Sequence, residues 1–277
     1  MVKKLKIFNN FNIPGKFKKS IILIGNFDGL HSGHQKLFEL AKKYKTKYKS
    51  KVGVVTFDPI PKMFFNKQIK NYRISNLNQK VTYLKRFGVD FVINKKFDKN
   101  FSKISYYNFI KNILSKKLRS KFIFVSNNFR FGHKREGNVV MLKKYENYFN
   151  YNLINPTPLK KNKKIVSSTI IRKLLENGKL SKANSFLKRN WEIEGKVQKG
   201  RMMGKKIGFP TCNIDIGNYV IAKPGVYAVK IRVNDKKKFY KGIANLGYRP
   251  TFKQKKILLE VNLFNFSGNL YNKKLSV

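Results

Sequence analysis

The segment Gly25–His34, with the sequence Gly-Asn-Phe-Asp-Gly-Leu-His-Ser-Gly-His, constrains this 277-residue chain more than any other. It follows the apolar run Ile21–Ile24 and precedes a stretch, residues 37–44, in which apolar side chains recur every three or four positions. This order predicts a buried strand, a glycine-rich turn and a helix that begins near His31. Because free N–H groups and the helix dipole attract anions at such a helix start, we interpret the turn as a nucleotide-phosphate site.

Two of the chain's three histidines, His31 and His34, stand at the mouth of this turn. Their spacing lets both side chains donate to one anion. Zinc binding is disfavoured, because no third His or Cys lies nearby to complete a ligand set. The remaining alternative is a pair of ordinary surface histidines. The flanking glycines, which allow a phosphate to approach the backbone closely, favour the phosphate interpretation.

The first half of the chain alternates strand-like and helix-like segments. Strands are expected at Ile21–Ile24, Val52–Phe57, Phe91–Ile93, Phe122–Val125 and Tyr151–Ile154, and helices at residues 34–45, 77–87 and 105–118. Such alternation predicts an α/β fold, with a parallel sheet covered by helices on both faces. Ligands of these sheets bind beyond the carboxyl ends of the strands, which is where the turn is expected to lie.

From about residue 190 the sequence changes to short strands punctuated by Gly and Pro. These strands are expected at Trp191–Val197, Gly225–Val233, Lys238–Ala244 and Ile257–Phe264, and they predict a small β-barrel or sandwich. Two helices, around Thr169–Glu176 and Ser181–Leu187, are expected to join the two halves.

The formal net charge of +49 suggests nucleic acid, an anionic membrane or acidic ligands as partners. The excess is mostly lysine, scattered along the chain without a recognisable nucleic-acid-binding motif, so we expect neither a specific nucleic-acid partner nor a membrane partner.

Cys212 is the only cysteine, which excludes an intramolecular disulfide. With no apolar run of transmembrane length and no signal peptide, a cytoplasmic location is expected.

The turn, together with seven further motifs in order along the chain, resembles the bacterial bifunctional riboflavin kinase/FAD synthetases. The further motifs are Thr56–Pro61, Asn128–Gly132, Val166–Arg172, Gly208–Asn213, Pro224–Ala228, Asn245–Phe252 and Leu259–Phe264. This resemblance spans about residues 20–277. It implies a Rossmann-like nucleotidylyltransferase domain at residues 1–186, followed by a small antiparallel riboflavin kinase barrel at residues 187–277.

The resemblance also implies two reactions, FMN + ATP → FAD + pyrophosphate and riboflavin + ATP → FMN + ADP, with Mg²⁺ accompanying ATP. Its implied catalytic residues are His31, His34, Arg172 and Glu260. Its implied ATP-binding residues are Gly25, Asn26, Phe27, Asp28, Gly33, Ser168 and Thr169. Asn128 is implied as an FMN contact, and Thr211 and Asn213 as the residues that hold the metal.

Read without the resemblance, these residues have simpler interpretations. Ser168 and Thr169 suit an ordinary helix N-cap, although hydroxyls and an arginine at a helix start also suit a second phosphate clamp. Thr211 and Asn213, two apart in an extended segment, are expected to point the same way and could reach one Mg²⁺–phosphate cluster, while Cys212 between them packs. Glu260, opposite an apolar row, would ordinarily be solvated. The base role that the resemblance implies for it fits phosphoryl transfer.

Members of the resembled family normally continue past the position of Val277 with an arginine-bearing turn and a helix. From this we expect the barrel to be short at its end and the kinase to be weaker than the adenylyltransferase, or inactive. Two other classes remain as rivals. A different nucleotidylyltransferase would share the turn but would not need Gly208–Asn213 or Asn245–Phe252. A basic nucleic-acid-binding protein would require a clustered basic face with interleaved aromatic residues.

Overall fold

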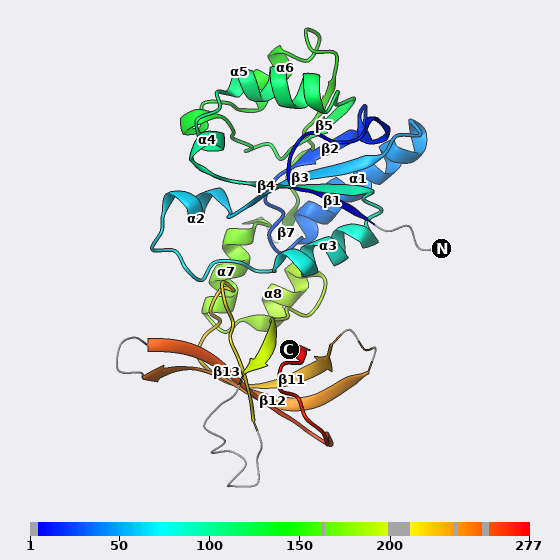
Figure 1. Cartoon of the computed structure of the whole chain (residues 1–277). Coiled ribbons are helices and arrows are strands. Elements are labelled where there is room, and N and C mark those ends of the chain that lie inside the picture. The colour runs from blue at the N-terminus through cyan, green and yellow to red at the C-terminus, as the bar shows by residue number, and fades with distance from the viewer. Residues whose placement is uncertain (1–4, 162–163, 199–210, 235, 237, 251–254) are drawn as a thin grey trace. The chain divides into compact units, whose positions relative to one another are not determined.

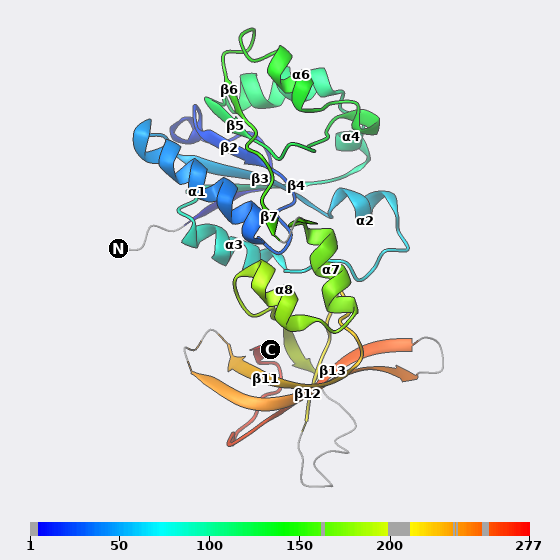
Figure 2. The same ribbon diagram turned by 180° about the vertical axis from the view of Figure 1, so that it is seen from behind.

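The computed structural model describes the chain except for residues 1–4, 162–163, 199–210, 235, 237 and 251–254 (Figure 1). The chain forms two compact units, described separately below. The N-terminal unit comprises Met1–Lys70 and Leu77–Ser167, and the C-terminal unit comprises Asn71–Asn76 and Ser168–Val277. Figure 2 shows the same elements from behind.

In the described part of the N-terminal unit, six strands form one sheet in the order β1-β4-β3-β2-β5-β6. They are β1 (Lys6–Phe8), β2 (Ile21–Ile24), β3 (Val52–Asp58), β4 (Phe91–Lys96), β5 (Phe122–Phe124) and β6 (Asn152–Ile154). Every neighbouring pair is parallel, which confirms the predicted parallel sheet. The edge strand β1 was not predicted from the sequence.

Helices and short turns connect these strands. They are α1 (Ser32–Lys47), α2 (Pro61–Phe65), α3 (Leu77–Arg86), α4 (Lys99–Ser102), α5 (Tyr106–Asn108) and α6 (Val139–Lys144), with 3₁₀ turns at Gly15–Phe17 and His133–Arg135. A short antiparallel pair, β7 (Lys160–Lys161) and β8 (Lys164–Ile165), precedes the end of the unit. No helix among the described residues is both long and apolar enough to span a lipid bilayer.

The helix expected over residues 105–118 is present, but it is not one regular α-helix. Helix α5 ends at Asn108 and the chain continues as a π-helical segment, Phe109–Lys117, which has a wider turn. Its buried side chains, Phe109, Ile110, Ile113 and Leu114, still recur at helical spacing. The apolar pattern therefore predicted a helix correctly and could not reveal which kind.

The side chains of the strands alternate between the two faces of the sheet. In β2, Ile21 and Leu23 join one buried cluster, whereas Ile22 and Ile24 join the other. Helices α1 and α3 contribute apolar side chains to the first cluster, and the π-helical segment contributes to the second. Both faces of β2 are thus covered by helices, which explains why this strand is an unbroken apolar run.

The C-terminal unit contains α7 (Ser168–Glu176), α8 (Leu180–Leu187) and a barrel. The described barrel strands are β9 (Glu194–Gln198), β10 (Cys212–Ile214), β11 (Gly225–Val233), β12 (Phe239–Pro250), β13 (Lys255–Leu263) and β14 (Lys274–Ser276). They close in the order β10-β13-β12-β11-β14-β9, and all pairs are antiparallel. The structure therefore decides for the barrel over the sandwich.

Several predicted strand boundaries are corrected: β4 runs on from Ile93 to Lys96, and strands of the barrel also change. Strand β12 runs on from Ala244 to Pro250, because its residues beyond Leu246 pair with β13. Strand β9 begins at Glu194 rather than Trp191. The indole N–H of Trp191 donates to the carbonyl oxygen of Ile74 (2.9 Å), and its backbone N–H donates to the side chain of Asn184 (2.7 Å). These contacts hold Trp191 outside the barrel ladder.

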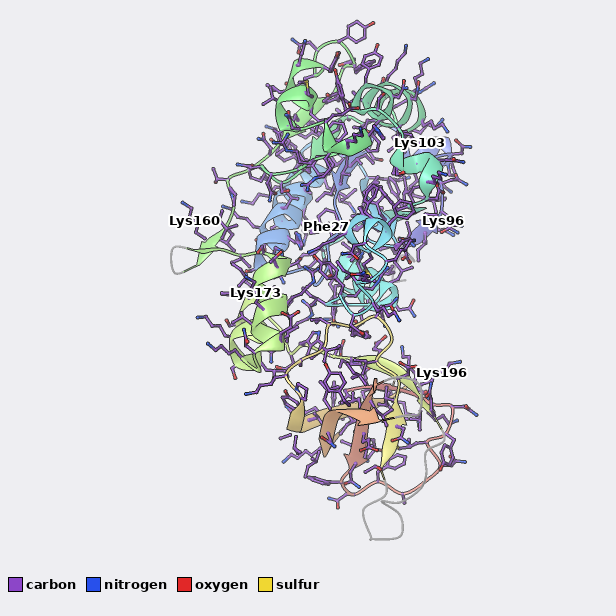
Figure 3. All side chains as sticks on the ribbon, turned by 90° about the vertical axis from the view of Figure 1, so that its left-hand side faces the viewer. Phe27, Lys96, Lys103, Lys160, Lys173 and Lys196 are labelled. Carbon is purple, nitrogen blue, oxygen red and sulfur yellow. The ribbon has the colours of Figure 1, made fainter. Side chains whose placement is uncertain are left out.

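The positive charge is spread over many elements of both units. Figure 3 labels five lysines that belong to or follow different elements: Lys96 in β4, Lys103 after α4, Lys160 in β7, Lys173 in α7 and Lys196 in β9. All five side chains are exposed. This distribution agrees with the scattered lysines of the sequence.

The core of the sheet makes a prediction about stability. Gly53 in β3 faces the ring of Phe91, and a Cβ atom at Gly53 would lie 2.2 Å from the ring's Cζ atom. Phe91 is fully buried and packs against Phe17, so its ring cannot move aside at little cost. We expect Gly53→Ala to lower the free energy of unfolding of the N-terminal unit by about 1–3 kcal/mol in urea titrations.

Gly15→Ala is the matched control, because a Cβ atom there meets nothing within 4 Å. It should change the unfolding free energy by less than about 0.5 kcal/mol. Equal unfolding midpoints for the two variants would contradict the packing described at Gly53.

Candidate active site

The glycine-rich turn follows β2, the strand from which later strands are added on both sides of the sheet. From β2 the sheet extends through β3 and β4 on one side and through β5 and β6 on the other. Loops that leave the carboxyl ends of two such neighbouring strands diverge and leave a crevice for a ligand. The loops that follow β2 and β5 are the segments containing Gly25–His34 and Asn128. The fold therefore brings these two predicted segments to the same edge of the sheet.

The backbone of the turn is strained. Phe27 and Leu30 have positive φ angles of 45° and 39°, a region that residues with side chains rarely adopt, and Gly29 between them adopts 78° without strain. Strained backbone of this kind clusters at functional sites, where the surrounding structure holds it in place. Here the side-chain amide of Gln35 donates to the carbonyl oxygen of Leu30 (2.9 Å).

Some of the predicted ATP-binding residues of the turn have buried side chains. Phe27 is buried against Phe38, with ring centroids 5.0 Å apart, so only its backbone remains for a ligand. Asp28 is also buried, at 2% exposure. Gly25 leaves room for the ring of Phe27, since an added Cβ atom would lie 3.2 Å from it.

The two histidines form one stacked pair. His31 is the N-cap of α1, and its Nδ1 accepts a hydrogen bond from the backbone N–H of His34 (3.4 Å). The two rings lie 3.7 Å apart between centroids and 21° from parallel. Gly33 permits this arrangement, because a Cβ atom there would approach the His31 ring to 3.2 Å. The predicted helix start at His31 is thus confirmed.

Burial lowers the pKa of His34 well below its ordinary value of about 6.5, and the nearby His31 and Lys80 lower it further. At neutral pH the imidazole of His34 is therefore uncharged. A neutral imidazole keeps one nitrogen as a donor and the other as an acceptor. His34 can thus donate to an anion, and binding of that anion would favour its protonation.

Three buried polar atoms within the turn have no hydrogen-bond partner among the described residues. They are Oδ1 of Asn26, Oγ of Ser32 and Nδ1 of His34. Buried polar groups are nearly always paired in folded proteins. Three such atoms within nine residues of sequence, at a helix N-terminus, are suited to a polar ligand.

Sequence reasoning did not include the buried lysine that supports the turn. Lys80 on α3 is 1% exposed, and its Nζ donates to the carbonyl oxygen of Asn26 (2.8 Å) and to Oγ1 of Thr56 (3.1 Å). The sequence pattern indicates that Lys80 is buried, because it stands three residues after Leu77 and four before Leu84, on the apolar face of the predicted helix. A lysine on such a face is rarely buried without a partner.

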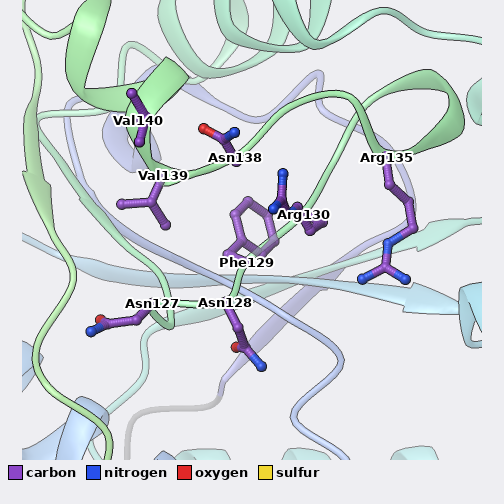
Figure 4. Close-up of a pocket in the computed structure, with 8 residues that line it drawn as sticks. All are labelled: Asn127, Asn128, Phe129, Arg130, Arg135, Asn138, Val139 and Val140. Carbon is purple, nitrogen blue, oxygen red and sulfur yellow. The ribbon is translucent and has the colours of Figure 1, made fainter.

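The loop after β5 contributes a cavity of about 370 Å³ (Figure 4). Its lining residues are Asn127, Asn128, Phe129, Arg130, Arg135, Asn138, Val139 and Val140. Asn128, the predicted FMN contact, accepts a hydrogen bond from the Ser126 hydroxyl (2.9 Å). Phe129 stacks on the buried Phe131 with ring centroids 5.3 Å apart. The cavity thus combines an aromatic wall, amide groups and two guanidinium groups.

Ser168, Thr169 and Arg172 lie in the first turns of α7, in the C-terminal unit. Arg172 is buried, and its Nε donates to the carbonyl oxygen of Tyr72 (2.7 Å). Its guanidinium group also lies over the Tyr72 ring, 3.6 Å from the centroid. Within the N-terminal unit, the carbonyl oxygen of Val166 comes within 3.4 Å of the Cβ position of Gly33. Val166, in the N-terminal unit, therefore lies beside the turn.

In the barrel, strand register groups three polar residues in one row. Asn213 of β10 pairs with Glu260 of β13, and Glu260 pairs with Asn245 of β12 on its other side. Directly paired residues share a face of the sheet, so these side chains are neighbours. Asn213 is buried, and its Oδ1 has no hydrogen-bond partner among the described residues. Asn245 was not among the sequence-predicted site residues.

Thr211, just before β10, is exposed. Cys212 is half-buried, and burial raises the pKa of its thiol, which keeps the sulfur protonated and less reactive at neutral pH. Among the described residues, no three His, Cys, Asp or Glu side chains come together to hold a metal ion. Ser32, Gln35 and Lys80 in the N-terminal unit, and Asn245 in the barrel, are the main polar neighbours that sequence reasoning missed.

Comparison with known proteins matches the chain to two family models, FAD synthetase at residues 14–170 and Riboflavin kinase at residues 187–277. A bifunctional riboflavin kinase/FMN adenylyltransferase from Buchnera aphidicola subsp. Schizaphis graminum is 41% identical over 261 residues, covering 93% of this chain and 83% of that protein. The protein of the same name from Escherichia coli strain K12 is 35% identical, covering 93% and 82%. A solved structure titled "Crystal Structure of Macrolide-efflux Protein from Streptococcus pneumoniae" has a TM-score of 0.83 at 27% identity, covering 98% of this chain and 88% of that one.

The lowered pKa of His34 gives a prediction that can be tested with an anion alone, without a flavin. In the free protein the pKa of His34 should lie below about 6.5, and tripolyphosphate should raise it by about one pKa unit or more, because a nearby negative charge favours the imidazolium form. Histidine ¹⁵N NMR titration measures this directly, and His133, the third histidine, serves as the internal reference. A His34 pKa that does not move when the anion binds would contradict a phosphate site at the turn.

Proposed function

The chain belongs to the family of bifunctional riboflavin kinase/FMN adenylyltransferases, and on that basis we propose how its residues divide the two reactions. It is a transferase of flavin coenzyme biosynthesis, which converts riboflavin and ATP to FMN and ADP, and FMN and ATP to FAD and pyrophosphate. We assign the adenylyl transfer to residues 1–186 and the kinase reaction to residues 187–277. The positions of the two family matches, residues 14–170 and 187–277, support this division.

In the adenylyl transfer, an oxygen of the FMN phosphate attacks the α-phosphorus of ATP, and the bond to the departing pyrophosphate breaks. The enzyme needs no nucleophile of its own for this step, so it acts by positioning and by stabilising charge. We assign the α-phosphate to His31 and His34. The observation that carries this assignment is their stacked pair at the N-terminus of α1, beside unpartnered buried polar atoms.

The other ATP contacts follow from what the turn exposes. Asn26, Asp28 and Gly33 would contact ATP mainly through backbone N–H groups, as would Phe27, whose side chain is in the core. The N–H of Gly25 is bonded to the carbonyl oxygen of Val55 (3.1 Å), so Gly25 would contribute by leaving space for the phosphates. Ser168, Thr169 and Arg172 at the start of α7 would bind the outgoing phosphates. The stacking of Arg172 on Tyr72 supports this role, because it fixes the plane of the guanidinium group near the start of α7.

We place FMN in the cavity after β5. Asn128 would contact the flavin through its amide, and Phe129 offers an aromatic face. Arg130 and Arg135 supply the positive charge that a phosphate-bearing substrate requires. The position of this loop, next to the turn at the carboxyl edge of the sheet, supports the transfer of an adenylyl group between the two ligands.

In the kinase reaction, Glu260 would accept the proton of the riboflavin 5′-hydroxyl as that oxygen attacks the γ-phosphorus of ATP and the bond from that phosphorus to the departing ADP breaks. Thr211 and Asn213 would hold Mg²⁺ with ATP, and the unpartnered buried oxygen of Asn213 fits a cation that prefers oxygen ligands. Bound there, Mg²⁺ would neutralise charge on the ATP phosphates. The strand register that places Asn213 beside Glu260 supports one common site.

The partners that we propose are ATP, riboflavin and FMN. We propose a cytoplasmic location, since both reactions consume ATP. The exposed lysines labelled in Figure 3 come from five separate parts of the fold, which supports neither a specific nucleic-acid partner nor a membrane partner.

The histidine pair can be tested against the kinase reaction of the same chain. The double variant His31→Ala/His34→Ala should lower kcat for adenylyl transfer by about a thousandfold, since two charge-stabilising donors are lost. It should leave riboflavin phosphorylation within about twofold of the wild type. His133→Ala is the matched control and should change neither activity. Unchanged FAD formation in the double variant would exclude the assigned roles.

The barrel site calls for the reverse experiment. Glu260→Gln keeps the shape of the side chain but removes the base, so phosphorylation of riboflavin should fall about 10²–10⁴-fold while adenylation of FMN continues. Glu192→Gln is the control, since Glu192 is paired with Arg232 (3.7 Å) away from this row. Full kinase activity in Glu260→Gln would exclude Glu260 as the general base. A wild-type chain that adenylates FMN but leaves riboflavin unchanged would identify an FAD synthetase with an inactive kinase unit.

A further inference from the structure

Lys80 is a charged side chain in the core of the N-terminal unit, with 1% of its surface exposed. Burying an ammonium group is unfavourable unless hydrogen bonds replace its hydration. A solvent-exposed position on α3 would have avoided that cost. The burial of Lys80 therefore indicates that its charge or its hydrogen bonds serve the structure around it.

A hydrogen bond from Lys80 and one from Thr56 meet at the same backbone carbonyl. The Nζ of Lys80 donates to the carbonyl oxygen of Asn26 (2.8 Å), and the Thr56 hydroxyl donates to the same oxygen (3.2 Å). Nζ also contacts Oγ1 of Thr56 (3.1 Å), so the three groups form a closed triangle. Lys80 comes from α3 and Thr56 from β3, so two separate elements hold the same point of the turn.

The carbonyl of Asn26 belongs to the peptide group that leads into the strained part of the turn. Phe27 follows immediately with φ of 45°, and Gly29 and Leu30 are also at positive φ. Gln35 anchors the far side of this strained stretch through the carbonyl oxygen of Leu30 (2.9 Å). Lys80 and Gln35 thus fix the two ends of the segment that precedes the histidine pair.

The charge of Lys80 also acts on that pair. After burial and His31, Lys80 is the third cause that lowers the pKa of His34. The ammonium group therefore favours the neutral imidazole in the free enzyme, and it adds positive potential where a phosphate would bind.

We propose that Lys80 is a positioning residue for adenylyl transfer: it holds the strained turn Gly25–His34 in the conformation that aligns the ATP α-phosphate with the histidine pair. This inference rests on the proposed function of the turn. Lys80 acts through the carbonyl of Asn26 and contributes no proton or bond to the reaction. A core lysine that served stability alone would affect both activities only through the amount of folded protein.

The test uses Lys80→Met in the full chain, with kcat and KM measured separately for adenylation of FMN. We expect kcat to fall about a hundredfold, because small displacements of reacting groups have effects of that size. KM for ATP should stay within about threefold, and riboflavin phosphorylation should be unchanged. Lys80→Arg, which keeps the charge and the donors, should recover at least part of the lost kcat.

Lys45→Met is the matched control. Lys45 is another hydrogen-bonded lysine of this unit, which binds Asp90 (2.7 Å) and the carbonyl oxygen of Gly88 (2.8 Å) near the far end of α1. Lys45→Met should retain wild-type kcat.

An NMR titration separates the effect of the Lys80 charge from the effect of its hydrogen bonds. The pKa of His34 should rise in Lys80→Met but stay unchanged in Thr56→Val, which keeps the ammonium group.

Wild-type kcat in folded Lys80→Met would overturn the proposal, and so would an equal loss in Lys45→Met. If Lys80→Met does not fold, Thr56→Val decides: a fall in kcat of about tenfold with unchanged KM and kinase activity supports positioning, whereas wild-type kcat shows that the triangle serves stability only. Absence of FAD formation by the wild-type chain would instead refute the function proposed for the turn.

Discussion

The carbonyl oxygen of Asn26 accepts hydrogen bonds from Lys80 and Thr56, and the geometry of the N-terminal site depends on that interaction. Two of the next four residues, Phe27 and Leu30, carry side chains at positive φ, a conformation that a free loop would not keep. The turn can stay strained because β3 and α3 hold its entry and α1 holds its exit. The strained backbone then delivers His31 to the N-cap of α1, where its ring stacks on His34.

The parallel sheet determines which segments can cooperate with this turn. The sheet order places β2 between β3 and β5, so the loops after β2 and β5 open at its carboxyl edge. The barrel organises its site differently, through cross-strand register that sets Asn213, Glu260 and Asn245 in one row. In each unit the proposed chemistry occurs where regular backbone pairing brings distant polar residues together.

Local pattern in the sequence was enough to predict β2 and β11 with their observed bounds, because an unbroken apolar run and a two-residue alternation are both clear signals. The start of α1 at His31 followed from the glycine-rich segment before it. Pattern could not reveal the π-helical turns of Phe109–Lys117, since the apolar spacing is nearly the same. The short strand β14 was missed because barrel closure, a long-range interaction, defines it.

The candidate site shows the same division. His31 and His34 stand in one motif and could be read together, whereas Lys80 lies far from them in sequence and reaches the turn only in the fold. The sequence showed that Lys80 lies between Leu77 and Leu84 on an apolar helix face. It could not show that Lys80 binds the carbonyl oxygen of Asn26. Glu260 and Asn213 were predicted separately, and only the strand register shows that they are neighbours.

The central claim is that this one chain transfers both the adenylyl group of ATP to FMN and the terminal phosphate of ATP to riboflavin. Incubation of the chain with riboflavin, Mg²⁺ and ATP labelled at either the α- or the γ-phosphorus, followed by separation of the flavins, tests it most directly. We predict γ-label in FMN, and both α- and γ-label in FAD. Release of the α-label only in ADP, with none in any flavin, would contradict the account.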